Sequence, residues 1–347
     1  MLKVATIALL VFGSAACKTT GNGSGSNWSS FAQMFRGADS SQPTYAAMGH
    51  DRLVSEQTTA NEGDLKDESA QLAEKLKKSP RDLNALLALA RIKIILKDSN
   101  TAELLARRIL AIDFRSRGAK IVMAHAAFMQ KNFDGARAIL RQLGGENAAE
   151  SESLNLLATL HYQKGEERKA EGLYARAVKI NPNDIAARMN LGILCLRGER
   201  LTQAEEQFAQ VLKIKPSHAD ALAHMGVVQA QRGQTSQAIE YYKNAKSENP
   251  TSEVASYNLA LAQKRSGDYE NAVETLEDML KVKSLSLAGH DAALAQLELI
   301  RNAASATSNL SGAEVDKIIA DAKQQRSKRS TTSTGDVYLT SNVGSYQ

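Results

Sequence analysis

Cysteine and histidine are the residue types in this chain that could act as nucleophiles or metal ligands, so their spacing decides whether such chemistry is expected. The cysteines are Cys17 and Cys195, and the histidines are His50, His125, His161, His218, His224 and His290. No His-Glu-x-x-His sequence, no close group of cysteine and histidine, and no Gly-x-Ser-x-Gly nucleophile motif occurs. We therefore expect no catalytic residue, no metal site and no cofactor, and a protein that is not an enzyme.

Cys17 offers a different chemistry, the attachment of a lipid. Lys3, an apolar run over residues 4–12 and small residues over 13–16 precede it, which is the order of a secretory signal peptide. The apolar run is too short to span a bilayer permanently. Ser14-x-Ala16 followed by Cys17 resembles the lipobox of bacterial lipoproteins, in which this cysteine becomes the acylated first residue; the family usually has Leu at the position of Ser14.

This resemblance implies cleavage after Ala16, so that residues 1–16 are a signal peptide and Cys17 carries the lipid. Lys18 stands where an aspartate would retain a lipoprotein in the inner membrane, so the implied location is the periplasmic side of the outer membrane. The alternative is a secreted periplasmic protein that is cut at the same place and carries no lipid. In both cases the Gly- and Ser-rich residues that follow predict a flexible tether.

A step of 34 residues orders the centre of the chain, over residues 83–286. Pro182, Pro216 and Pro250 are separated by this step, which matches the length of a helix-turn-helix repeat. The same step places alanine at six positions, which are Ala102, Ala136, Ala170, Ala204, Ala238 and Ala272. A second column of small residues holds Ala90, Ala124, Ala158, Gly192, Gly226 and Ala260. Small residues let two helices approach closely, so the pattern predicts stacked helix pairs.

These positions resemble the tetratricopeptide repeat. The third unit shows the pattern best, as Leu157-Ala158, Gly165, Ala170-x-x-x-Tyr174 and Pro182. Other units depart from it locally, with Lys97 at the first turn and with Ala148 and Ser284 at two exit positions. The resemblance implies an all-α protein, a right-handed α-solenoid of six helix pairs with capping helices and flexible termini. In this register Cys195 faces inward and is expected to be a small core residue rather than a reactive thiol, and His161 is expected to pack rather than to bind a ligand.

The remaining parts of the chain are divided by composition. Residues 17–63 are predicted to be a lipid-anchored tether followed by a partly ordered segment, and residues 64–80 a helix that caps the first repeat and ends at Ser79-Pro80. Residues 287–323 are predicted to form two C-terminal capping helices. Residues 324–347 are predicted to be a disordered, basic, Ser/Thr-rich tail.

The charge of the chain lies mostly in that tail. The formal net charge is +5, and the segment 323–347 holds four basic residues and one acidic residue, which are Lys323, Arg326, Lys328, Arg329 and Asp336. The repeats themselves are therefore close to neutral, and we expect no nucleic-acid partner. Aromatic residues make up only 5% of the chain, which disfavours an aromatic-rich β sandwich.

The resemblance also implies a binding site. In the tetratricopeptide family the first helices of the pairs line a concave groove that holds peptides or helices. The matching positions here are Leu87, Ile94, Ile95, Ile121, Val122, Phe128, Met129, Met189, Asn190, Ile193, Arg197, His224, Tyr257, Asn258, Leu261 and Arg265. Asn190 and Asn258 stand where the family often uses asparagine to hold the backbone of an extended peptide. The Lys/Asn/Arg clamp that holds C-terminal carboxylates in chaperone-tail receptors is not reproduced across neighbouring repeats, so such a receptor is not expected.

The groove residues of the first two repeats are apolar, and the sequence predicts that they form an exposed patch too large for a lone soluble protein. Two explanations remain open. The patch is covered either by the chain's own residues 31–60, which include Phe31, Phe35, Tyr45 and Leu53, or by an amphipathic helix or apolar segment of a partner.

The functional expectation is a non-enzymatic scaffold that binds envelope proteins in its groove and the membrane through its N-terminal lipid. The chain is similar to the repeat lipoproteins that escort type IV pilus secretins and to those of gliding-motility complexes, which implies a role in assembling a motility-related envelope machine. The alternative is a regulator or adaptor of a cell-wall or polysaccharide biosynthesis enzyme. A third hypothesis is an anionic-surface binder that acts through the basic tail.

Overall fold

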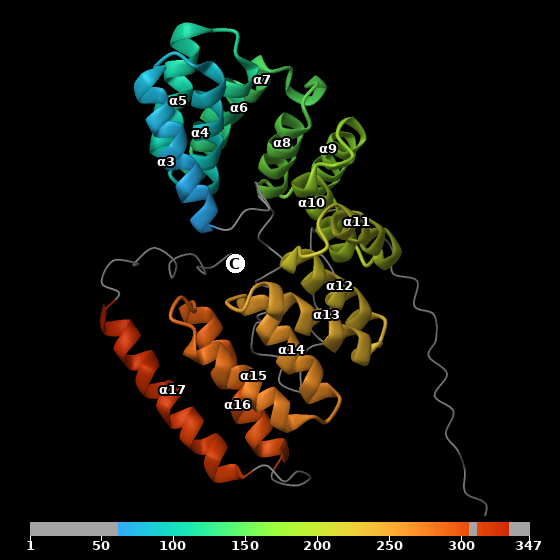
Figure 1. Cartoon of the computed structure of the whole chain (residues 1–347). Coiled ribbons are helices and arrows are strands. Elements are labelled where there is room, and N and C mark those ends of the chain that lie inside the picture. The colour runs from blue at the N-terminus through green and yellow to red at the C-terminus, as the bar shows by residue number, and fades with distance from the viewer. Residues whose placement is uncertain (1–61, 305–310, 333–347) are drawn as a thin grey trace, which may run out of the picture.

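The computed structural model describes residues 62–304 and 311–332 (Figure 1). Within these ranges every regular element is helical, with no strand, so the predicted all-α class is confirmed. After α3 (Glu62–Lys78), six helix pairs follow: α4 (Leu83–Ile95) with α5 (Ser99–Ile112), α6 (Arg117–Met129) with α7 (Phe133–Gln142), α8 (Ser151–Gln163) with α9 (Glu167–Ile180), α10 (Ile185–Arg197) with α11 (Leu201–Ile214), α12 (Ala219–Gln231) with α13 (Thr235–Glu248), and α14 (Glu253–Arg265) with α15 (Tyr269–Lys281). A short 3-10 helix, η1 (Gly145–Asn147), follows α7, and α16 (Leu287–Ala304) and α17 (Gly312–Thr332) end the described chain.

The first helix of each pair begins at a capping residue, and these caps repeat every 34 residues. The side chains of Asp82, Ser116, Asp184, His218 and Ser252 each accept a hydrogen bond from the backbone N–H three residues later. Such a bond satisfies one of the amides that a helix leaves open at its N-terminus. Glu150, at the same position in the third pair, makes no such bond. The step seen in the sequence is therefore the distance between helix starts.

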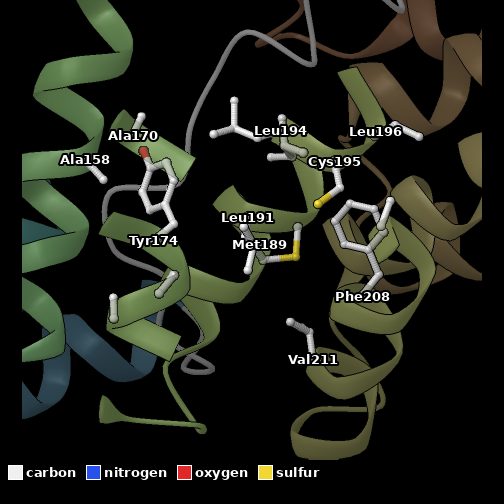
Figure 2. Close-up of a cluster of buried hydrophobic side chains, with 14 of the residues drawn as sticks. Ala158, Ala170, Tyr174, Met189, Leu191, Leu194, Cys195, Leu196, Phe208 and Val211 are labelled. Atoms are coloured by element: carbon white, nitrogen blue, oxygen red, sulfur yellow. The ribbon is translucent and has the colours of Figure 1, made fainter. Parts of the chain in front are cut away.

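The six alanines of the second helices lie in the centre of the fold. Each of them is fully buried, and so are the large side chains four residues later in the middle pairs, Tyr174, Phe208 and Tyr242 (Figure 2). A small residue in one helix thus faces a ring from the other, which is the close packing that the sequence predicts. Helix pairs also contact their neighbours, with α9 on α10, α11 on α12 and α13 on α14, and the pairs follow one another as a solenoid (Figure 1).

The turn within each pair has a left-handed residue at its end. Lys97, Lys131, Gly165, Glu199, Gly233 and Gly267 all have a positive φ, and they are again 34 residues apart. Glycine adopts this conformation without strain, whereas Lys97, Lys131 and Glu199 adopt it at a cost. This turn lets the amide one residue later reach back to the first helix, as Asp98 N does to Lys93 O over 2.8 Å.

The C-terminal part departs from the predicted boundaries. α17 continues to Thr332, whereas the sequence predicts disorder from residue 324. Residues 324–332 contain no proline or glycine, and Arg326 donates to Asp291 of α16 over 2.6 Å and 3.1 Å. In addition, Ser286 Oγ accepts from Gly289 N over 2.9 Å, in the same way as the cap Ser252 one step earlier. α16 therefore starts in register with the first helices of the repeats. The signal peptide, the tether and Cys17 lie outside the described residues.

Candidate binding groove

The sixteen groove residues all lie on first helices, namely α4, α6, α10, α12 and α14. These helices form one continuous row together with α8, because α4 contacts α6, α6 contacts α8, α8 contacts α10, α10 contacts α12 and α12 contacts α14. The row ends at α16, which contacts α14. The structure therefore brings the predicted residues onto one series of neighbouring helices, although they are spread over 179 positions of the chain, from Leu87 to Arg265.

The apolar end of the row is more closed than the sequence predicts. Ile94, Ile121 and Val122 are buried, and none of the apolar groove residues on α4 and α6 is an exposed large side chain. The reason is contact between successive first helices. Gly118 of α6 leaves room for Leu87 of α4, since a Cβ atom on that glycine would lie 2.8 Å from Leu87 Cδ2. The expectation of a broad exposed patch is wrong for the described residues, and residues 31–60, which one explanation placed over it, lie outside them.

The middle of the row carries a polar link that the sequence reasoning missed in part. Asn190 Nδ2 of α10 donates to Asn155 Oδ1 of α8 over 2.9 Å, and both side chains are buried. Thr159 Oγ1 lies 3.0 Å from Asn155 O and 2.9 Å from the hydroxyl of Tyr174. Asn155 lies one position before the asparagine column, so column matching alone does not identify it. This network fixes the asparagine of one repeat against the preceding repeat.

Arg197 and His224 are held by aromatic rings. The Arg197 guanidinium lies over the ring of Tyr162, 5.0 Å from its centroid, and forms an ion pair with Glu167 over 3.0 Å. The His224 ring stacks on Phe208 with centroids 5.0 Å apart and an interplanar angle of 13°. Burial lowers the pKa of His224 to about 4, because the protonated ring would lose its hydration. His224 is therefore a neutral, packed side chain at pH 7.

The last groove helix, α14, combines an unpaired amide with a cation. Asn258 is only 1% exposed, and neither its Oδ1 nor its Nδ2 has a hydrogen-bond partner. Lys264 Nζ donates to Gln296 Oε1 of α16 over 2.7 Å, and Gln296 Nε2 donates to the Tyr257 hydroxyl over 3.2 Å. Arg265 is exposed at the end of the helix. Sequence reasoning missed Gln296, because α16 lacks the small-residue columns; the cap at Ser286 is the signal that could have identified it.

Comparison with known families identifies the repeated unit. The model of a tetratricopeptide repeat matches residues 121–185, and the model of the middle tetratricopeptide-like domain of cilia and flagella-associated protein 70 matches residues 154–305. The chain is a tetratricopeptide-repeat protein. The predicted repeat register is thereby confirmed. No curated protein sequence matches the chain.

Solved structures agree with this tetratricopeptide fold. The anaphase-promoting complex hetero-tetramer Cut9–Hcn1 superposes with a TM-score of 0.55 at 16% identity, covering 72% of this chain and 47% of that one. Pseudomonas aeruginosa pilF superposes with a TM-score of 0.50 at 16% identity, covering 62% of this chain and 93% of that one. At this identity the likeness concerns the fold alone.

The other residue types singled out in this tetratricopeptide chain have packing roles. Cys195 is buried, and burial raises the pKa of its thiol, so it is the small core residue that the register predicts. His161 Nδ1 lies 2.6 Å from Glu166 Oε2 at the turn of its own pair. Among the described residues no group of three His, Cys, Asp or Glu side chains is arranged to hold a metal ion. None of the described helices combines the length and apolar character needed to cross a bilayer.

Proposed function

We propose that this protein is a scaffold that holds a segment of a partner protein in the row of first helices from α4 to α14. The observation that carries the proposal is the amide of Asn258, which is buried on this row without a hydrogen bond. A buried polar group without a partner costs about 1 to 3 kcal/mol. An amide can donate and accept at once, so the backbone of an extended segment satisfies it.

The proposal includes a place for the scaffold. The N-terminal residues favour export and acylation of Cys17, so we propose an outer-membrane lipoprotein that faces the periplasm, with residues 18–61 as the connection to the first helix. The partner is then an envelope protein. By the lipobox, the tether and the groove together, we favour assembly of a motility-related envelope machine, such as a gliding-motility complex or a type IV pilus secretin, over regulation of a cell-wall enzyme.

The groove part of this proposal is tested by crosslinking in intact cells and affinity purification of the full chain. Asn258→Leu removes the amide with little change in volume, and Asn244→Leu is the matched control, because Asn244 is exposed on a second helix, α13. We expect the wild type and Asn244→Leu to recover the same partner, identified as a secretin, a motility subunit or a cell-wall enzyme. Asn258→Leu should lose it while remaining folded. Equal recovery by all three would contradict the groove as the binding site.

The location is tested separately. Cells fed a labelled fatty acid should yield a labelled wild-type protein and an unlabelled Cys17→Ser variant, with the wild type in the outer-membrane fraction. An unlabelled wild type in the soluble periplasmic fraction would instead indicate the secreted alternative.

A further inference from the structure

We propose that the groove end formed by α14 and α16 contains a subsite for a carboxylate, formed by Lys264 and Arg265, and that the bound partner segment is acidic at this point. The inference rests on the proposed function, because the carboxylate belongs to the segment held in the groove. It adds the chemistry by which that segment is selected.

The charges along the row single out this end. Arg91 donates to both carboxylate oxygens of Glu152 over 3.0 Å, so these two charges neutralise each other. Arg197 is paired with Glu167. Lys264 and Arg265 differ, since no carboxylate lies within ion-pair distance of either of them in the part of the chain that the structure describes. The two neighbouring cations on the last turn of α14 are thus left without a counter-charge.

Asp220 is the other charged residue among the groove positions of these repeats, and its place keeps it from serving as that counter-charge. It lies in the first turn of α12, whereas Lys264 and Arg265 lie in the last turn of α14. The positive end of the groove is therefore complementary to an acidic group brought by a partner.

The position of Lys264 is fixed by neutral groups rather than by an anion. Its ammonium donates to Gln296 Oε1, and Gln296 is in turn held by the Tyr257 hydroxyl. Half-burial lowers the pKa of Lys264, since the charged form loses hydration without gaining an opposite charge. A lysine that served only the dipole at the end of α14 would need neither burial nor an anchor. An ammonium has three donors, so a carboxylate can bind beside Gln296 with a charge-assisted hydrogen bond.

Asn258 provides an independent indication of a ligand at the same place. It is on the same helix as Lys264, 1% exposed, and both atoms of its amide are unpaired. Six residues of an α-helix advance about 9 Å, which an extended chain spans in about three residues. The subsite therefore fits an extended segment whose backbone pairs with Asn258 and whose acidic side chain, about three residues away, reaches Lys264.

The test begins with a phage-displayed library of random twelve-residue peptides selected on the full chain. We expect selected peptides to be enriched in aspartate or glutamate. One selected peptide is then synthesised with its acidic residue as Glu and as Gln, and both are titrated by fluorescence anisotropy. Loss of one charge-assisted hydrogen bond corresponds to about a tenfold change in affinity. The wild type should prefer the Glu peptide by about tenfold, and Lys264→Gln should bind both peptides equally.

Two further variants separate the role of the charge from a general loss of structure. Lys264→Arg should keep the preference for the Glu peptide. Lys243→Gln, which changes an exposed lysine of α13, should leave both affinities unchanged. Circular dichroism and thermal melting confirm that each variant is folded.

The outcomes distinguish this inference from the proposed function. A selection that returns no binding peptide contradicts both. Peptides that bind without acidic enrichment, or a Glu preference that survives in Lys264→Gln, would overturn the carboxylate subsite and leave the scaffold proposal standing. A synthetic peptide of residues 31–60 serves as competitor. If it displaces the acidic peptide with equal affinity and the same dependence on Lys264, the occupant is this chain's own segment and the assignment to a partner is wrong.

Discussion

The ring of Tyr242 occupies the space that Gly226 leaves open. A Cβ atom on this glycine would lie 2.5 Å from Tyr242 Cε1, closer than real Cβ atoms approach. Gly192 and Phe208 repeat the relationship one step earlier, at 2.6 Å. Each glycine of the small-residue column in the first helices thus matches an aromatic ring of the second helix.

The first prediction follows from this fit. Gly226→Ala should destabilise the fold by about 1 to 3 kcal/mol, because the added methyl group displaces a fully buried ring. Urea unfolding of the full chain measures the change. Gly172→Ala is the control, since nothing lies within 4 Å of that position on α9, and it should stabilise by about 0.5 to 1 kcal/mol. A destabilisation of equal size in both variants would contradict the packing explanation.

The second prediction concerns the left-handed turn residues. Glu199 has a φ of 57° and Gly165 a φ of 77° at equivalent turns. Glu199→Gly should stabilise the protein by up to about 1 kcal/mol, and Gly165→Ala should destabilise it by about 1 kcal/mol, because a side chain is strained in this conformation. The two melting temperatures should therefore move in opposite directions, and a shift of the same sign in both would argue against strain at these turns.

The third prediction is a loss of stability in mild acid. Burial lowers the pKa of both His125 and His224 to about 4, from about 6.5 in the unfolded chain. Between these values the unfolded state binds more protons, so stability is complete above pH 6.5 and falls as the pH drops toward 4. Each histidine should contribute a loss of about 2 kcal/mol between pH 7 and pH 5. Urea unfolding against pH measures it, and His224→Gln should reduce the slope by about half. A slope unchanged by this substitution would mean that other groups cause it.

The fourth prediction compares two asparagines of the same column. Asn190→Leu should cost about 1 to 3 kcal/mol, because it leaves Asn155 Oδ1 buried without its donor. Asn258→Leu should instead raise the free energy of unfolding by about 1 kcal/mol, since it replaces an amide that has no partner in the free chain. Denaturant titration of both variants decides the matter. If Asn258→Leu were the more destabilising of the two, the amide would have an internal structural role.

The sequence predicts the interior of each repeat well and the contacts between repeats poorly. Ala170 and Tyr174 are read directly from their column, because both are buried by the partner helix of the same pair. Asn155 and Gln296 are not, because their partners, Asn190 and Lys264, lie on a neighbouring repeat or cap. The closure of the apolar patch around Leu87 and Gly118 is missed for the same reason. The distance between successive first helices depends on how the solenoid winds, and a column of residue types does not encode it.

The regular series of helix caps means that the molecule can change length in whole units. Removing residues 184–217 would join Asn183 to His218, and the cap His218 would then occupy the place of Asp184 with the same spacing to the residues on both sides. The groove would lose one helix while both ends of the protein kept their neighbours. A lineage of such proteins is thus free to fit longer or shorter partners by duplicating or deleting a single segment, without redesigning any interface.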